Sequence, residues 1–285
     1  MNRLLIFLAL AISALASPPQ QMLLATTPAT SGYDADAQAY FNAIVANSGT
    51  ISTASKGYVN TFILAAKSHG YFTKLVCFNM LVGDQLAAAQ VQYNGNASTS
   101  SVATNHNFVG GDYTEAGGLV GNGSTKYLDT GYNPTALTNT NAGMWSYLVA
   151  GGQYIMGNLQ GSFVGAFEVE GSASANIGGH ITDTVAYSFS NYTKGMVGVT
   201  TDGASSSTVK VYSNGSDVTA GTGLADASFT SNNIYVFALN LQGTGPFGYN
   251  SCTQRFYAVS TGLTSTQASN FYSDVLAFET SLSRN

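Results

Sequence analysis

The stretch from residue 196 to residue 218 contains two segments with strand-like apolar and polar patterns, joined by a turn of small residues. The segments 196–201 and 208–213 have the length and the period of strands, and Val209 and Val211 would share one buried face. Asn214-Gly215 follows directly and favours a type I′ turn, because both residues accept positive φ. This stretch predicts antiparallel strands, and the rest of the chain is organised around it.

Short apolar runs separated by Gly, Asn, Ser and Thr recur from residue 90 to residue 262. This spacing is typical of an antiparallel β-sandwich or barrel. The run 234–239 does not alternate, which indicates a central strand covered on both faces. The other expected strands are 91–93, 126–129, 144–149, 162–170, 184–190 and 255–260.

Residues 33–89 form a predicted helical segment ahead of the sandwich. Residues 34–47 carry apolar side chains at helical spacing. A second helix is expected to begin after Ser52 or Thr53, whose hydroxyls can cap it. Residues 71–89 are apolar on nearly all sides, which predicts a buried segment.

A helix is also predicted at the end of the sequence. Thr264 and Gln267 form a capping box, in which each side chain binds a backbone N–H of the first turn. The residues that follow make one apolar stripe, which should dock on the N-terminal helices or on an end of the sandwich. The stripe consists of Ala268, Phe271, Val275, Phe278 and Leu282.

Residues 1–16 have the pattern of a signal peptide. Arg3 precedes an apolar run at 4–16, and Ala14-Leu15-Ala16 fits the small-residue rule for cleavage. The run is shorter than the roughly 20 residues that a spanning helix needs. We expect cleavage after Ala16, a linker at 17–32 and no later transmembrane segment. This predicts a secreted or cell-surface protein, or a virion protein if a phage encodes it.

Composition and charge restrict the partners and the redox chemistry. Charged residues make up 8% of the 285 residues, and the net charge is −5 without any basic run. Phosphate binding needs clustered cations, so nucleic acid is excluded as a partner. Cys77 and Cys252 leave two interpretations open: one disulfide of an exported protein, or two buried thiols.

Three stretches carry a family resemblance. The stretches are similar to the opening, the middle and the end of one kind of domain. They are residues 121–134 (GNGSTKYLDTGYNP), the hairpin around Asn214-Gly215, and residues 255–267 with the helix that follows. That domain is the laminin-G-like or concanavalin A-like jelly roll of phage and bacterial surface proteins. The resemblance implies a mainly β fold, an antiparallel jelly-roll sandwich over 90–285. It leaves the function open, because such sandwiches occur in lectins, glycanases, adhesion modules and virion proteins.

Glu168 and Glu170 are the sharpest catalytic candidates. As residues i and i+2 of one strand they share a face, so both carboxylates can meet a sugar. The segment resembles the E-x-D-x-x-E motif of concanavalin-like glucanases, but Ala173 stands where the third acid belongs. The other interpretation is a solvent-facing pair on an edge strand, and we assign no catalytic residue from the sequence.

Trp145, Tyr154 and Tyr249 are the candidate ligand-binding residues. Aromatic rings form platforms for sugars, although an aromatic residue in a strand more often belongs to the core. Tyr249 lies in a loop and is the best of the three.

Metal sites are indicated less clearly. The three histidines, His69, His106 and His180, lack the spacing of zinc ligands. A single Ca²⁺ remains possible, because several aspartates lie in or beside turns, where they can also simply cap the backbone. These are Asp112, Asp129, Asp183, Asp202 and Asp217.

Two function classes follow. The first is a non-enzymatic binding or structural module at a cell or virion surface, which meets glycans or neighbouring subunits. The alternative is an endo-acting glycan hydrolase or lyase built on the same sandwich.

Overall fold

The computed structural model describes most of the chain after the predicted linker. The described residues are 32–94, 99–149, 154–160, 167–171, 177–181, 194–201, 209–220, 228–242 and 244–284. The predicted signal peptide, nearly all of the predicted linker and the predicted strand 184–190 lie outside these residues and stay predictions. The elements below all belong to one unit, Tyr33–Asn285.

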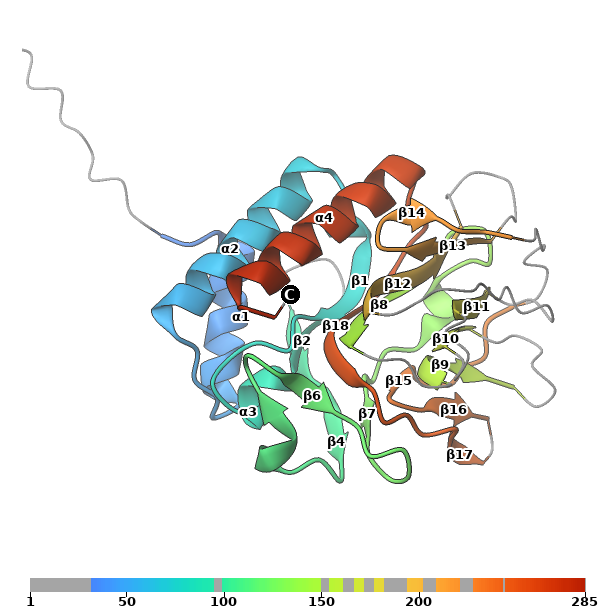
Figure 1. The fold of residues 1–285 in the computed structure, drawn as a ribbon, viewed down its shortest axis with the longest axis horizontal. Coiled ribbons are helices and arrows are strands. Elements are labelled where there is room, and N and C mark those ends of the chain that lie inside the picture. The colour runs from blue at the N-terminus through green and yellow to red at the C-terminus, as the bar shows by residue number, and fades with distance from the viewer. Residues whose placement is uncertain are drawn as a thin grey trace, which may run out of the picture. The chain divides into compact units, whose positions relative to one another are not determined.

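The larger sheet, sheet A, has the strand order β14-β13-β12-β8-β18-β1-β2-β3, with β6 paired to β18 and β5 to β6 (Figure 1). Its strands pair antiparallel throughout. They are β1 (Leu75–Asn79), β2 (Val91–Asn94), β3 (Ser100–Val102), β5 (Tyr113–Thr114), β6 (Gly118–Val120), β8 (Gly143–Val149), β12 (Lys194–Thr200), β13 (Lys210–Ser213), β14 (Ser216–Asp217) and β18 (Thr253–Ser260).

The second sheet, sheet B, has the order β11-β10-β9-β15-β7-β4, with β16 and β17 attached beside β9. It is mixed, because β16 runs parallel to β9. Its strands are β4 (Thr104–His106), β7 (Tyr127–Asp129), β9 (Tyr154–Leu159), β10 (Phe167–Gly171), β11 (Ile177–Ile181), β15 (Tyr235–Val236), β16 (Leu239–Leu241) and β17 (Gly245–Phe247).

The two sheets share one apolar core. Val199 of sheet A and Met156 and Val169 of sheet B belong to the same buried cluster. A polar bridge also crosses the interior, since Nε2 of Gln254 donates to the carbonyl oxygen of Ile155 at 3.0 Å. The chain is therefore mainly β, with two sheets facing each other.

Local sequence chemistry explains the elements that were predicted correctly. Asn214 and Gly215 have φ values of 49° and 77°, as a type I′ turn between β13 and β14 requires. Ser52 caps the second helix through a hydrogen bond from the N–H of Ser55. The capping box of Thr264 and Gln267 is formed.

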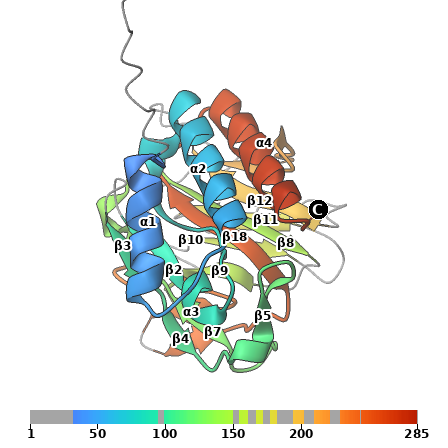
Figure 2. The same cartoon turned by 90° about the vertical axis from the view of Figure 1, so that its left-hand side faces the viewer.

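Three long helices cover the face of sheet A that points away from sheet B. They are α1 (Ala35–Ala46), α2 (Thr53–Ser68) and α4 (Ser265–Ser281), and Figure 2 shows them side by side in front of the sheet. The predicted docking of the last helix on the N-terminal helices is confirmed, since the ring of Phe278 lies 5.8 Å from that of Phe62 on α2. The helix also packs on the face of sheet A, not on an end of the sandwich. The ring of Phe271 lies 5.6 Å from that of Trp145 and 5.7 Å from that of Phe256, measured between centroids. The short helices are η1 (Phe72–Lys74), α3 (Leu86–Ala89), η2 (Gly110–Asp112) and η3 (Pro134–Ala136).

The predicted helical segment 33–89 contains a strand at the centre of sheet A. Residues 71–89 are largely buried as expected, but Leu75–Asn79 form β1, between β18 and β2. The sandwich thus begins before residue 90. A strand covered by helices on one face and by the core on the other shows no alternation, so its period does not distinguish it from a buried helix.

The predicted central strand 234–239 is broken in two. Phe237 has a φ of 71°, a left-handed value that ends β15 and turns the chain into β16. Its ring is fully buried and packs 5.1 Å from that of Phe108. Tertiary packing therefore holds a conformation that the apolar run alone does not indicate.

Cys77 and Cys252 do not form a disulfide; both are free and buried. Cys77 pairs with Val259 across β1 and β18. Cys252 precedes Val259 by seven residues, which separates the two cysteines by about 20 Å along an extended strand. A disulfide needs Cα atoms within about 7 Å, so the second interpretation, two buried thiols, is the correct one.

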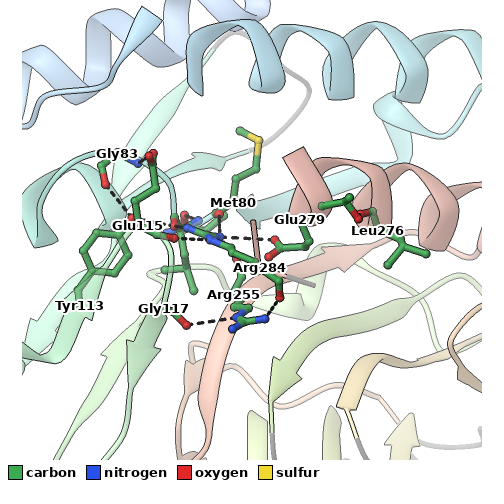
Figure 3. Close-up of polar contacts among 12 residues, drawn as sticks. Met80, Gly83, Tyr113, Glu115, Gly117, Arg255, Leu276, Glu279 and Arg284 are labelled. Atoms are coloured by element: carbon green, nitrogen blue, oxygen red, sulfur yellow. Dashed lines mark hydrogen bonds and ion pairs between the residues drawn. The ribbon is translucent and has the colours of Figure 1, made fainter. Parts of the chain in front are cut away.

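A buried charged cluster, which we call the C-terminal network, fixes α4 to sheet A. Arg284 is 1% exposed, and it donates to the carbonyl oxygens of Met80, Leu81, Glu115 and Arg255. Its Nη1 lies 3.5 Å from Oε1 of the fully buried Glu279 (Figure 3). Arg255 in turn donates to the carbonyl oxygen of Arg284. The segment after α4 is thereby held against β1, β5, β6 and β18.

The C-terminal network makes stability depend on pH. Burial raises the pKa of Glu279 from 4.5 to about 7, against the attraction of Arg284 and Arg255. The folded state therefore binds more protons than the unfolded state, and this carboxyl destabilises the fold increasingly as pH rises from about 4.5 to about 7. We expect the free energy of unfolding to fall by about 3 kcal/mol over this range relative to Glu279→Gln.

Urea midpoints of the wild type and of Glu279→Gln at pH 4.5, 6 and 8 measure this effect. The two proteins should be similar at pH 4.5, and the variant should be the more stable at pH 8. Carboxyls such as Asp34 titrate in both proteins and cancel in the comparison. A constant difference between the two at all three pH values would contradict the assignment.

Candidate functional site

The outer face of sheet B carries a polar and aromatic surface. Tyr127 and Asp129 alternate with Leu128 on β7, and Tyr235 alternates with Val236 on β15. Leu128 and Val236 are fully buried in the shared core. The other three side chains therefore point to the opposite face, because successive residues of a strand alternate. On that face Tyr127 is itself buried, at 9% exposure, while Asp129 and Tyr235 are half-buried.

Register places further groups on this face. His106 of β4 is paired with Tyr127, and Asp129 is paired with Tyr235. Directly paired residues of antiparallel strands present their side chains to the same side of the sheet. We define the outer-face patch as His106, Tyr127, Asp129, Tyr235 and Tyr249.

Tyr127 lies at the centre of the patch. The imidazole of His106 stacks on its ring, with centroids 4.1 Å apart and planes at 3°. The ring of Tyr235 lies 4.7 Å away on the neighbouring strand, and that of Tyr249 packs edge-on at 6.1 Å. The side chains of Tyr127 and Tyr235 are also hydrogen-bonded to each other. The four rings pack into one continuous aromatic cluster, which contains two kinds of acid–base group: one imidazole and three phenols.

Asp129 is the carboxylate of the patch. Its Oδ1 accepts the backbone N–H of Gly131 at 2.8 Å, and its Oδ2 accepts the side-chain amide of Asn233 at 3.3 Å. Burial, and next the negative charge of Asp129, raise the pKa of Tyr235 to about 12. Burial also raises the pKa of Tyr127. Both phenols are therefore protonated near neutral pH, and because one donates to the other, the pair keeps one phenol hydrogen for a ligand.

The loop that carries Asn233 is held by amide side chains. Three successive backbone carbonyls of this loop each accept one asparagine amide. The donors are Asn133 to Ser231 at 2.5 Å, Asn158 to Asn232 at 2.6 Å and Asn240 to Asn233 at 2.9 Å. These bonds come from η3, β9 and β16, so the position of Asn233 beside Asp129 is fixed by three separate elements.

His106 and Asp129 are diagonal neighbours on adjacent antiparallel strands, because His106 pairs with Tyr127 two residues before Asp129. Diagonal neighbours lie about 7–8 Å apart. This is the spacing of the two positions on the sheet, and it puts an imidazole and a carboxylate on the same face, one strand apart.

Of the three predicted ligand-binding residues, one belongs to the patch and two are buried elsewhere. Tyr249 is half-buried and belongs to the patch. The prediction for Trp145 is wrong, because this residue is 1% exposed beneath α4 and its Nε1 donates to Oγ of Ser260. Tyr154 is also wrong as an exposed platform, because it is buried under the backbone of Gly248, where a Cβ would lie 2.0 Å from its ring.

Glu168 lies on the same face as the patch but outside it. Its strand β10 runs between β9 and β11, and the side chain is fully buried, so the alternative of a solvent-facing edge pair is wrong for Glu168. Three strand spacings separate it from Asp129, about 14 Å. That distance is too long for a pair of glycosidase carboxyls. The side chain of Glu170 lies outside the described residues.

The aspartates suggested for calcium that the structure describes are engaged with protein groups. Asp112 pairs with Lys126 at 2.5 Å, and Asp217 pairs with Lys210 at 3.3 Å. Asp183 and Asp202 lie outside the described residues. Within the described ranges, no three His, Cys, Asp or Glu side chains gather closely enough to hold a metal ion.

Sequence reasoning missed His106, Tyr127 and Tyr235 as site residues. Their pairing depends on strand register, which brings together residues more than 100 positions apart. A signal was nevertheless present, because alternation within 127–129 places a tyrosine and an aspartate on the face opposite Leu128.

Among the described helices, none is long and apolar enough to cross a membrane.

Comparison with known proteins gives a limited likeness. No protein-family model and no curated protein matches the chain. Similar solved structures include NanB sialidase from Streptococcus pneumoniae, at 15% identity over 52% of this chain with a TM-score of 0.36. Trypanosoma rangeli sialidase in complex with sialic acid matches at 12% identity over 70% of the chain with a TM-score of 0.46. A T. rangeli sialidase mutant with trans-sialidase activity matches at 14% over 78%, with a TM-score of 0.47.

The chain spans only 27%, 32% and 39% of the length of these three proteins. TM-scores below 0.5 transfer no catalytic residue to it. The neighbours are nevertheless glycan hydrolases, and this finding corrects the first function predicted from the sequence, a non-enzymatic binding or structural module. The alternative, a glycan hydrolase or lyase, is the better supported of the two.

Proposed function

We propose that the chain is a glycan hydrolase whose substrate lies across the outer-face patch. One observation carries the proposal: His106 and Asp129 stand diagonally across a surface of three tyrosines. Aromatic rings offer sugars an apolar surface, and the protonated phenols offer hydrogen bonds to hydroxyls. The patch thus combines binding surface with an acid and a base.

In the proposed reaction Asp129 is the general base and His106 the general acid. Asp129 takes a proton from a water molecule, whose oxygen then bonds to the anomeric carbon. His106 gives a proton to the leaving oxygen as the glycosidic bond breaks. The reaction proposed here is the inverting one, in which water attacks the sugar from the face opposite the leaving group.

The remaining patch residues bind and orient. Asn233 holds one carboxylate oxygen of Asp129, and the N–H of Gly131 holds the other. Tyr249 lies at the rim of the patch, where a sugar beside the cleaved bond would rest. The proposal further classes the fold as a jelly roll of the laminin-G-like type, for which the residues 121–134 and the hairpin at Asn214-Gly215 are the support.

Reducing-end release from a panel of polysaccharides tests the proposal. Asp129→Asn and His106→Gln should each lower kcat by about 10²- to 10⁴-fold, the usual contribution of one general acid or base. Tyr249→Ala should raise KM more than it lowers kcat, because it removes a binding surface only. Chromatography of the products separates hydrolysis from elimination, which would leave an unsaturated sugar.

Two variants serve as controls. Asp217→Asn removes a turn aspartate of sheet A, and Tyr58→Phe removes a hydroxyl at the helical layer; both should keep full activity. Wild-type activity that survives in Asp129→Asn would place the reaction elsewhere on the molecule. Failure of the wild type on every member of the panel would reject the proposed function.

A further inference from the structure

Apart from Lys194, the lysines and arginines that the structure describes make contacts with other groups than those of the outer-face patch. Each lysine and arginine except Arg3 lies in the described residues, and the internal stretches outside the description contain neither residue type. Lys67 pairs with Asp34 and Asp36, Lys210 pairs with Asp217, Lys74 donates to the carbonyl oxygen of Gly262, and Lys56 lies over the ring of Phe41. Lys194 begins β12 of sheet A.

The three remaining cations, Lys126, Arg255 and Arg284, are also bound to groups of the protein. Lys126 precedes Tyr127, and its Nζ lies 2.5 Å from the carboxylate of Asp112. Arg255 and Arg284 are held in the C-terminal network by backbone carbonyls and Glu279. Guanidinium groups are the usual partners of carboxylate and sulfate groups on ligands, and here both are occupied inside the fold.

The part of the patch around Asp129 and Tyr235 carries a carboxylate charge, while His106 on β4 acts as the proton donor in the proposed reaction. Asp129 lies beside Tyr235, and its charge reaches the phenol strongly enough to help raise the pKa of that tyrosine. A second negative charge bound next to Asp129 would be repelled in an environment that is partly shielded from water. A neutral sugar meets no such repulsion and can use the amide and phenol groups.

We propose that the substrate of the outer-face patch is a neutral glycan, without uronate, sulfate or sialic acid at the sugars that contact the patch. The inference rests on the proposed function and narrows its substrate class. It also separates this chain from the sialidases that its structure resembles, one of which was solved with sialic acid.

Matched polymers that differ only in charge test the inference. The pairs are β-glucan with its carboxymethyl derivative, galactan with sulfated galactan, and methyl-esterified with de-esterified galacturonan. In at least one pair the neutral member should be cleaved at least tenfold faster in kcat/KM, and no anionic member should be preferred. Faster cleavage of an anionic member would overturn this inference and leave the proposed hydrolase standing. Absence of cleavage of all six polymers would reject the hydrolase, and the inference with it.

A charge variant gives an internal check on any pair that is cleaved. Thr104 is exposed and paired with Asp129, so Thr104→Lys adds a cation directly across from the carboxylate. The neutral-to-anionic ratio of kcat/KM should fall at least severalfold. Val102→Lys adds the same charge to the exposed edge of sheet A and should leave the ratio unchanged. Equal ratios in both variants would show that charge at the patch does not select the substrate.

Discussion

Replacing Arg284 by alanine should lower the free energy of unfolding by about 3–5 kcal/mol at pH 7.5, as expected when one partner of a buried ion pair is removed. The substitution takes the donors away from four backbone carbonyls and leaves Glu279 buried without its neighbouring cation. Because Glu279 has a pKa of about 7, the loss should be smaller at pH 5, where the carboxyl is protonated. Denaturant unfolding at the two pH values measures both effects.

A matched control and a double variant sharpen this test. Lys194→Ala removes an exposed cation and should change stability by less than about 0.5 kcal/mol. Adding Glu279→Gln to Arg284→Ala should recover part of the loss at pH 7.5, because the uncompensated negative charge disappears. If Arg284→Ala unfolds at the wild-type denaturant concentration, the C-terminal network does not hold α4 to sheet A.

Replacing Phe271 by alanine should cost about 3–5 kcal/mol, the range for truncation of a fully buried phenylalanine. Its ring packs against those of Tyr71, Trp145 and Phe256, and therefore joins α4 to the segment before β1 and to two strands of sheet A. The cavity left by truncation would be bounded by large rings that cannot collapse into it. Thermal or urea unfolding measures the loss.

Leu64→Ala is the control for Phe271→Ala. Leu64 is about as large but 49% exposed on α2, so its truncation should cost less than about 0.5 kcal/mol. A wild-type midpoint and slope for Phe271→Ala would mean that α4 is free of the sheet in solution. The variant should leave the proposed glycan-cleaving activity unchanged where it is folded, since α4 lies on sheet A and the patch on sheet B.

The parts of the fold that sequence predicted correctly are those decided by neighbouring residues. The turn at Asn214-Gly215 needs positive φ at two adjacent positions, and the capping box joins Thr264 to Gln267 within one helical turn. Both depend on chemistry inside a few residues, so a pattern of letters contains the information.

The parts that sequence did not predict are those decided by distant residues. Residues 75–79 are apolar whether they form a strand or a helix, and pairing with β2 and with β18, which begins about 180 residues later, decides for the strand. The sequence alone would place Arg284 on the surface as an ordinary cation. It is buried because the carbonyl oxygens of Met80 and Glu115, far away in sequence, accept its hydrogen bonds. The outer-face patch depends on the register between β4, β7 and β15, which the sequence does not give. Trp145 was misassigned because the residue type alone does not show whether a side chain is buried.

The place of β18 in sheet A has a consequence for how the chain is made. β18 pairs with β8, β1 and β6, yet its first residue, Thr253, is synthesised about 170 residues after the end of β1. A nascent chain emerging from the ribosome can pair β1 with β2 and β8 with β12, but the edges of β1 and β8 that β18 joins stay unpaired until the end of the sequence is made. Such long-range closure is slow and leaves strand edges open to other chains. Expression temperature and chaperone supply should accordingly decide the yield of folded protein more than the stability of the finished sandwich does.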